Sequence, residues 1–190
     1  MAGKTLPAKA LTSSKKSNAP TRKARKAPPG KGKSASAGLK PGAKAPAFTL
    51  PRDGGSAVSL ADFAGRSLVL YFYPRADTPG CTREAIDFSR LKGAFSRAGA
   101  EVLGVSADPV KTQDAFKSKH KLTIALASDE KRQMLEDYGV WQEKSLYGRK
   151  FMGIVRMTFL IGPDQRIARI WPKVSVDGHA EEVLAAAKAL

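Results

Sequence analysis

The sequence contains one cysteine, Cys81, among its 190 residues. An intrachain disulfide is therefore impossible, and so is a zinc site built from several cysteines. The chain also lacks a run of about 18 apolar residues and an apolar stretch near its N-terminus, which a membrane span or a signal peptide would need. We therefore expect neither membrane insertion nor secretion, and we predict a reducing, cytoplasmic compartment.

The first 40 residues contain no acidic and no aromatic residue. They hold 11 of the 33 Lys and Arg residues, mixed with Ala, Pro, Ser and Gly, and so carry most of the net charge of +16. Such a segment cannot bury enough apolar surface to offset its ordering entropy, and its charges repel one another. We predict a disordered basic tail over residues 1–40 and one folded domain over residues 41–190.

Residues 41–190 alternate short apolar runs with segments of helical periodicity. This alternation predicts an α/β fold with a mixed central sheet flanked by helices. Asp108 is predicted to cap one helix and Gly139 to end another. The predicted strands are 47–50 and 57–60 as a hairpin, 67–73, 101–106, 123–127, and 153–161 with 166–171 as a second hairpin; the predicted helices are 79–98, 109–119, 129–138 and 177–190.

Cys81 follows the buried strand 67–73 and lies at the start of the helix that comes next. Thr78 is a candidate N-cap, and Pro79 suits the first helical position. Cys81 then falls in the first turn, where free backbone N–H groups and the helix dipole favour an anion. A lone cysteine is more often a small buried apolar residue, but this position favours a reactive thiolate instead.

The run Thr78-Pro79-Gly80-Cys81 looks like a redox C-x-x-C loop whose first cysteine has become threonine. Exchange between two thiols of this loop is therefore excluded. A single thiolate beside a hydroxyl suits attack on a small electrophile that the hydroxyl can orient, such as the O–O bond of a peroxide.

Longer motifs carry a family resemblance over about residues 41–190. Pro74-x-x-x-Thr78-x-x-Cys81 resembles the active-site motif of peroxiredoxins, and the wider run from Tyr71 to Glu84 is similar to the bacterioferritin comigratory (Q-type) subfamily. The similarity continues in Tyr138-Gly139-Val140-Trp141, in Tyr147-Gly148-x-x-x-Met152-Gly153-Ile154-x-Arg156, and in Trp171-Pro172-Lys173-Val174 followed by Gly178-His179-Ala180-Glu181-Glu182-Val183-Leu184. The resemblance implies a thioredoxin-like fold and an antioxidant thiol peroxidase that reduces hydrogen peroxide and organic hydroperoxides, with no cofactor and no metal.

The resemblance also implies roles for five residues. Cys81 is the peroxidatic nucleophile, which is oxidised to a sulfenic acid. Thr78 hydrogen-bonds the peroxide, Pro74 shields the pocket from water, and Arg156, on a strand facing the site, stabilises the thiolate and the leaving oxygen. The alternative for Arg156 is a surface charge on an edge strand. Glu84 either orients the active-site arginine or complements the helix dipole as a first-turn acid.

One position departs from many relatives of the subfamily. They carry a resolving cysteine five residues after the first, where this chain has Ile86. The chain therefore resembles a one-cysteine variant, whose sulfenic acid must be reduced by an external thiol. Thioredoxin, glutaredoxin and a small thiol all remain open as the reductant. We expect a monomer, with a dimer as the alternative.

The basic tail of residues 1–40 leaves three interpretations open. It is a solubilising extension, a transit peptide, or a segment that binds nucleic acid without sequence specificity and tethers the redox domain to DNA. The last interpretation would make the protein DNA-associated, with a nucleoid or nuclear location, and residues 21–26 would suit a nuclear address.

Two tryptophans and two histidines receive structural interpretations. Trp141 and Trp171 lie among apolar neighbours and are predicted to pack in the core. His120 and His179 have no partners at metal-ligand spacing, and we expect both to be structural or surface residues.

Overall fold

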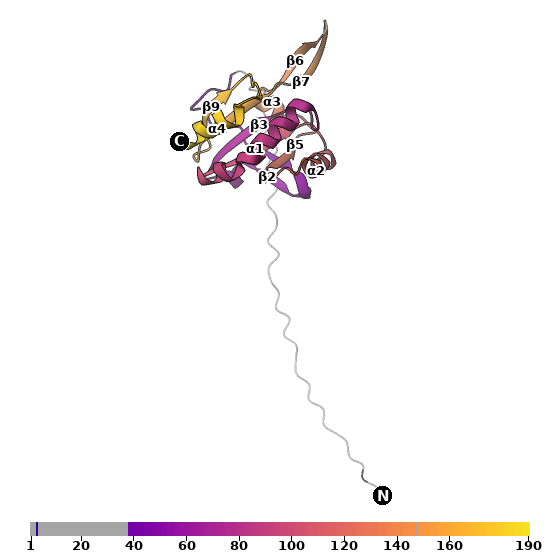
Figure 1. The fold of residues 1–190 in the computed structure, drawn as a ribbon, viewed down its shortest axis with the longest axis vertical. Helices are drawn as coiled ribbons and strands as arrows, with labels where there is room; N and C mark the ends of the chain where they lie inside the picture. Colours follow the sequence, from indigo (N-terminus) through magenta and orange to yellow (C-terminus); the bar gives the residue numbers. More distant parts are fainter. Residues whose placement is uncertain (1–2, 4–37, 147) are drawn as a thin grey trace. The chain divides into compact units, whose positions relative to one another are not determined.

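The computed structural model describes Gly3, residues 38–146 and residues 148–190 (Figure 1). The predicted tail, and the nucleic-acid contact assigned to it, lie outside the described residues except at Gly3 and residues 38–40. Leu39 packs against the hydrophobic core, so packing against the domain begins before Pro41. No helix of the described part is both long and apolar enough to cross a membrane.

A mixed five-stranded sheet forms the centre of the domain, with the strand order β5-β4-β3-β8-β9. β3 pairs in parallel with β4 and β4 with β5, whereas β8 runs antiparallel to both β3 and β9. This arrangement confirms the predicted mixed sheet. The strands are β3 (Ser67–Phe72), β4 (Ala100–Ser106), β5 (Ala125–Ser128), β8 (Met157–Ile161) and β9 (Ile167–Trp171).

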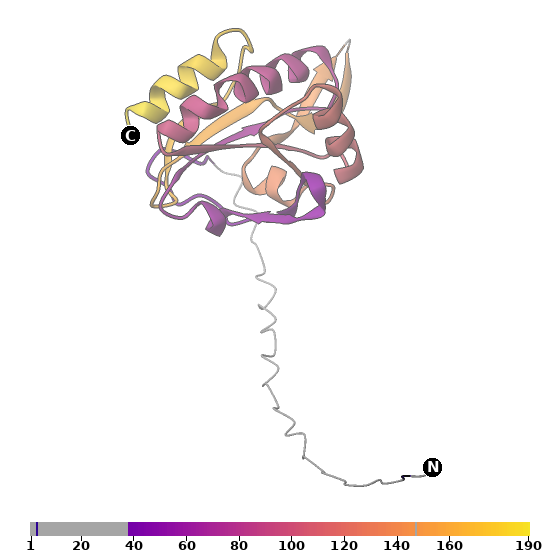
Figure 2. The same cartoon turned by 60° about the horizontal axis from the view of Figure 1, so that its bottom comes forward.

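Every residue of β3 is buried, because its two faces contribute to two separate cores. Side chains alternate along a strand, so Val69 and Tyr71 face one layer while Leu70 and Phe72 face the other. α1 (Pro79–Arg97) and α4 (His179–Lys188) lie side by side over the first face, as Figure 2 shows.

The second face of the sheet is covered by shorter elements. The predicted N-terminal hairpin is present as β1 (Thr49–Pro51) and β2 (Ala57–Ser59), followed by the 3-10 helix η2 (Leu60–Phe63). Its turn forms the 3-10 helix η1 (Asp53–Gly55), which packs against α2 (Val110–Lys119). The buried carboxylate of Asp53 holds this corner together, since it accepts hydrogen bonds from the backbone N–H of Leu126 (2.8 Å) and from Lys117 Nζ (2.6 Å).

The helix predicted over residues 129–138 is shorter than expected. α3 spans only Gln133–Asp137. Asp129 is buried and accepts a hydrogen bond from the backbone N–H of Leu135 (2.9 Å), and Arg132 takes a left-handed conformation with φ 62°. The segment before α3 is therefore a turn closed by the Asp129 side chain. Gly139 (φ 68°) follows the helix as predicted.

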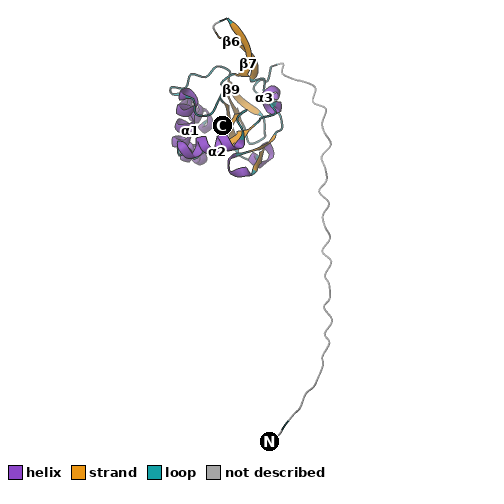
Figure 3. Cartoon of the chain, turned by 90° about the vertical axis from the view of Figure 1, so that its right-hand side faces the viewer, coloured by secondary structure: helices purple, strands orange, loops and turns teal. Residues whose placement is uncertain are grey.

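The strand predicted over residues 153–161 is wrong at its start. Residues 153 and 154 belong to a separate hairpin, formed by β6 (Trp141–Leu146) and β7 (Arg149–Ile154), and β8 begins at Met157. The β6–β7 hairpin extends away from the main sheet (Figures 1 and 3). Its sequence lacks an apolar alternation because most described side chains of β7 are exposed.

Candidate active site

Cys81 occupies the first turn of α1, as predicted. Thr78 is the N-cap residue and Pro79 the first helical residue, so Cys81 is the third residue of the helix. The Cys81 side chain is only 2% exposed. The Thr78 hydroxyl makes no capping bond and instead donates to the carbonyl oxygen of Arg75 (3.0 Å). The thiol is thus enclosed at the positive end of a helix.

Arg156 contacts Cys81 although the two residues are 75 positions apart in the sequence. Its Nη2 donates a hydrogen bond to Cys81 Sγ over 3.1 Å. Arg156 lies in the short link between β7 and β8, so its predicted placement on a strand is wrong, although it does face the thiol. A Cβ at Gly80 would lie 3.4 Å from Nη2, which is ordinary van der Waals contact, so the guanidinium lies directly against the first turn of α1.

Glu84 is the third member of this cluster. Its side chain is 1% exposed, and its Oε2 accepts a hydrogen bond from Nη1 of Arg156 in a buried ion pair. Burial raises the pKa of Glu84 to about 7, although attraction to Arg156 opposes the shift. Burial also disfavours the charge on Arg156, but the attraction of Glu84 and Cys81 outweighs it and raises the pKa of the guanidinium. Because α1 has no acid in its first turn, the helix-dipole interpretation of Glu84 loses its basis.

Asp108 holds the loop between β3 and α1. The prediction that it caps α2 is wrong, because Pro109 occupies the N-cap position. The carboxylate turns toward the loop instead, and its Oδ2 accepts hydrogen bonds from the backbone N–H of Ala76 (2.7 Å) and from Ser106 Oγ (2.8 Å). The end of β4 thus fixes the loop that leads to Cys81.

A second anchor of the same loop was missed by the sequence reasoning. Asp77 has a left-handed φ of 59° and contacts Lys119 Nζ and His120 Nε2, each at 2.6 Å. Hydrogen bonds from Lys119 and then from His120 lower the pKa of Asp77. Its partners lie 42 and 43 residues away in sequence, so no local pattern could have paired them. His120 is accordingly a structural residue, as predicted.

The remaining singled-out residues are structural as well. His179 is buried, with Nε2 in a hydrogen bond to Thr158 Oγ1 (2.8 Å), and burial lowers its pKa to about 4. Trp171 is buried in the core and its indole N–H donates to Glu182 (2.8 Å). Trp141 is half-buried, with the Arg132 guanidinium stacked 4.7 Å from its ring centre.

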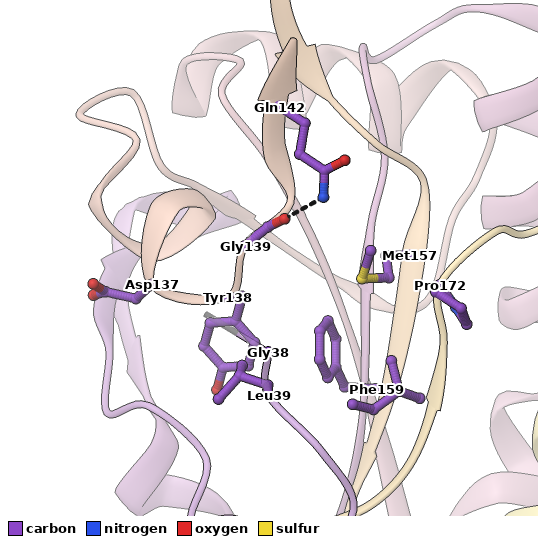
Figure 4. A pocket seen from close by; sticks show the side chains of 10 residues that line it. Gly38, Leu39, Asp137, Tyr138, Gly139, Gln142, Met157, Phe159 and Pro172 are labelled. Carbon is purple, nitrogen blue, oxygen red and sulfur yellow. Dashed lines mark hydrogen bonds between the residues drawn. The ribbon is translucent and has the colours of Figure 1, made fainter. Parts of the chain in front are cut away.

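A cavity of about 200 Å³ lies elsewhere, between Tyr138, Phe159 and Leu39 (Figure 4). Figure 4 shows the Tyr138 and Phe159 rings facing this cavity, with the Gln142 side chain bonded to the carbonyl oxygen of Gly139. None of the predicted site residues lines it. The cavity is therefore separate from the thiol site.

Comparisons with known proteins show the family of the chain. Residues 41–170 match the AhpC/TSA family. The chain is 45% identical over 144 residues to Peroxiredoxin Bcp of Xanthomonas campestris pv. campestris, covering 75% of this chain and 90% of that protein. It is 40% identical over 146 residues to Peroxiredoxin Bcp of Escherichia coli K12, covering 77% and 94%. The solved structure of Xanthomonas campestris Peroxiredoxin Q matches with a TM-score of 0.72 at 44% identity, covering 75% of this chain and 90% of that one.

These matches define the class of the protein as a thiol-dependent peroxidase with a thioredoxin-like fold. The chain belongs to the AhpC/TSA family, within which its relatives are Bcp or Q-type peroxiredoxins. The resemblance stated from its motifs is confirmed.

Proposed function

We propose that Cys81 is the peroxidatic nucleophile and that the enzyme reduces hydrogen peroxide and organic hydroperoxides. The observation that carries this assignment is the hydrogen bond from Arg156 Nη2 to Cys81 Sγ at 3.1 Å. A permanent cation that donates to sulfur stabilises the thiolate, which is the nucleophilic form. Cys81 is also the one cysteine of the chain.

The reaction follows from this geometry. The Cys81 thiolate attacks the terminal oxygen of the peroxide, an S–O bond forms, and the O–O bond breaks. Cys81 becomes a sulfenic acid, and the departing oxygen takes a proton and leaves as water or an alcohol. The hydrogen bond from Arg156 to Sγ supports a role for this cation in stabilising the negative charge that moves from sulfur to the leaving oxygen. Work on the Xanthomonas campestris Bacterioferritin Comigratory Protein describes alkyl peroxide reduction by that relative.

Thr78 and Pro74 complete the proposed site. The Thr78 hydroxyl, which donates to Arg75 in this structure, can turn toward a bound peroxide because threonine hydroxyls rotate about a single bond. Pro74 lies two residues beyond the end of β3 and contributes no N–H that would bind water. Glu84 orients Arg156 rather than touching the peroxide.

The sulfenic acid requires an external thiol. The position of the expected resolving cysteine is Ile86, whose side chain is 43% exposed on α1. An intramolecular disulfide cannot form with one cysteine. We propose that reduction proceeds through a mixed disulfide between Cys81 and that thiol.

Mass spectrometry tests the assignment directly. The purified protein is exposed briefly to a small excess of hydrogen peroxide together with a sulfenic-acid trap, and its intact mass is compared with that of Cys81→Ser. We expect one trapped adduct in the parent and none in Cys81→Ser. An unreacted parent protein would refute the assignment of Cys81.

A further inference from the structure

A groove of about 480 Å³ lies between the end of β3 and the β6–β7 hairpin. Pro74 and Arg75, which begin the loop that leads to Cys81, form one side of it. The hairpin forms the other side through Trp141, Lys144 and residues 151–154. The groove therefore borders the start of the loop that leads to Cys81, and Ile154 of its lining lies two residues before Arg156 in the sequence.

Three cations line this groove: Arg75, Arg132 and Lys144. None of them forms an ion pair with another residue of the described part of the chain. Asp108 is the one acidic residue of the lining, and its Oδ2 is already engaged by Ala76 and Ser106. The groove is thus positively charged, and no carboxylate of the described residues forms an ion pair with its three cations.

Lys144 links the groove to the active site. Partial burial lowers the pKa of Lys144, the charge of Arg156 lowers it further, and Cys81 opposes the shift. The lysine therefore lies within electrostatic reach of both active-site groups. An ammonium that is partly removed from water and unpaired gains from a carboxylate placed beside it.

Apolar side chains form the rest of the lining. Phe151 and Met152 are 46% and 50% exposed, which is unusual for residues of this size. Trp141 lies beneath the Arg132 guanidinium, so this cation is held in place by a ring. A ligand with carboxylates and an apolar stem matches such a lining.

We propose that this groove binds the reducing substrate, and that this substrate is a low-molecular-weight peptide thiol carrying carboxylates, for which glutathione is the probe. The inference rests on the proposed function of Cys81. The volume of the groove falls in the range of small-ligand sites, roughly 300–1,000 Å³. Cys81 is 2% exposed, which favours a small thiol that can enter over a cysteine held on the surface of a protein. Carboxylates at Arg132 and Lys144 would aim the thiol toward the loop of Cys81.

Reduction of the Cys81 sulfenic acid consumes two molecules of the reducing thiol. The first thiolate attacks the sulfur of the Cys81 sulfenic acid, an S–S bond forms, the S–O bond breaks, and the hydroxide takes a proton to become water. The second thiolate attacks the sulfur of the bound thiol, which releases a free disulfide and returns Cys81 as a thiolate. The peroxide consumed earlier is the oxidant.

The experiment compares an anionic thiol with a neutral one on the same protein. The full chain is oxidised with one equivalent of peroxide, and the rate of sulfenic acid loss is measured with glutathione and with 2-mercaptoethanol. We expect the ratio of the two rates to fall at least tenfold in Lys144→Glu, and to fall with rising salt in the parent. Lys150→Glu is the matched control, because Lys150 lies on the same hairpin, pairs with Glu143 at 3.0 Å and does not line the groove. Its ratio should stay within twofold of the parent.

Equal ratios in the parent, Lys144→Glu and Lys150→Glu would overturn the proposal. A second assay separates this failure from failure of the proposed function. The mixed disulfide of Cys81 with 2-mercaptoethanol is formed without peroxide, by exchange of the thiolate with the disulfide of 2-mercaptoethanol, which releases one free 2-mercaptoethanol, and its cleavage by glutathione is followed. Cleavage that slows at least tenfold in Lys144→Glu alone supports the groove even if peroxide never yields a sulfenic acid, whereas equal cleavage rates refute the groove whatever peroxide does.

Discussion

The buried carboxylate of Glu84 accepts a hydrogen bond from Nη1 of Arg156, while Nη2 of the same guanidinium donates to Cys81. A planar guanidinium held at two edges cannot rotate freely about its terminal bonds. Glu84 also offsets the cost of burying the arginine charge. The guanidinium that contacts Cys81 is thus held in place by Glu84, which lies on the same helix as the thiol.

Replacement of Glu84 by glutamine should slow the reaction of Cys81 with peroxide by about tenfold or more, because Arg156 loses its charged partner. The pH profile should change as well. Burial raises the pKa of Glu84 to about 7. The oxidation rate of Cys81 in the parent should therefore include a component that increases as the pH rises through 7 and the Glu84 carboxylate forms. Glutamine cannot ionise, and this component should be absent in Glu84→Gln. Rate constants from single-turnover oxidation between pH 5 and 9 would measure both effects.

Glu181→Gln is the matched control, because Glu181 is an exposed glutamate that pairs with Arg90 on the helical layer. It should leave both the rate and the profile unchanged. A Glu84→Gln rate within twofold of the parent, with the component near pH 7 retained, would show that Arg156 does not depend on Glu84.

The Thr78 hydroxyl is predicted to act on the peroxide, and two substitutions separate the hydroxyl from the shape of the side chain. Thr78→Ser keeps the hydroxyl and should stay within about threefold of the parent rate. Thr78→Val keeps the branched shape but removes the donor, and should lose about 100-fold in the rate of Cys81 oxidation. Stopped-flow measurement of that rate checks both. Equal rates in the two variants would remove Thr78 from the chemistry.

The sequence sufficed for those parts of the fold that depend on local patterns. The nearly all-apolar run of β3, the helical periodicity of α1 and the turn residues of the first hairpin each carry a local signal, and each element is present. Cys81, Thr78 and Pro79 could be placed at the start of α1 for the same reason.

The parts that were missed depend on contacts between distant residues. The Asp129 side chain closes a turn where a helix was expected, because its hydrogen bond to Leu135 competes with helix formation. Asp108 serves the active-site loop through Ala76, which is 32 residues away. The β6–β7 hairpin has exposed side chains on both faces and so lacks the apolar alternation that marks a half-buried strand.

Removal of residues 1–37 should leave the peroxidase reaction intact, because the described site is built entirely from residues 74–156. This end point retains Leu39, which packs against the core. We expect the rate of Cys81 oxidation to stay within twofold of that of the full chain. Retention of both proteins on immobilised DNA at low salt tests the tail separately. A truncated protein that folds but does not react with peroxide would contradict the predicted division of the chain.

His179 should make the stability depend on pH. Burial lowers its pKa to about 4 in the folded chain, from 6.5 for an ordinary histidine. Between these values the unfolded chain binds a proton that the folded chain does not, so the free energy of unfolding falls as the pH falls, by up to about 1.4 kcal/mol per pH unit. Glu84 acts in the opposite sense, because its raised pKa makes the folded chain bind the extra proton between pH 4.5 and about 7.

The variant His179→Gln isolates the histidine contribution from that of Glu84. Its stability deficit relative to the parent should be constant above pH 7 and should shrink as the pH falls toward 4, because glutamine does not titrate. Urea unfolding of both proteins at pH 4.5, 5.5 and 7.5 measures this difference. A deficit that is the same at all three values would mean that His179 is not held neutral by the fold.

Gly104 is required by the ring of Tyr71, its direct partner across the β3–β4 pair. A Cβ at Gly104 would lie 2.6 Å from Cζ and Oη of that ring, which is itself stacked on Phe88 at 4.7 Å and has no space to withdraw. Gly104→Ala should therefore lower the free energy of unfolding by about 1–3 kcal/mol or more. Gly93→Ala is the control, because Gly93 lies inside α1 with 3.6 Å to the nearest atom, and alanine there should raise stability by about 0.5–1 kcal/mol. Urea unfolding measures both changes. A Gly104→Ala protein as stable as the parent would show that the sheet accommodates the methyl group and that the Tyr71 ring does not require glycine at the position opposite it.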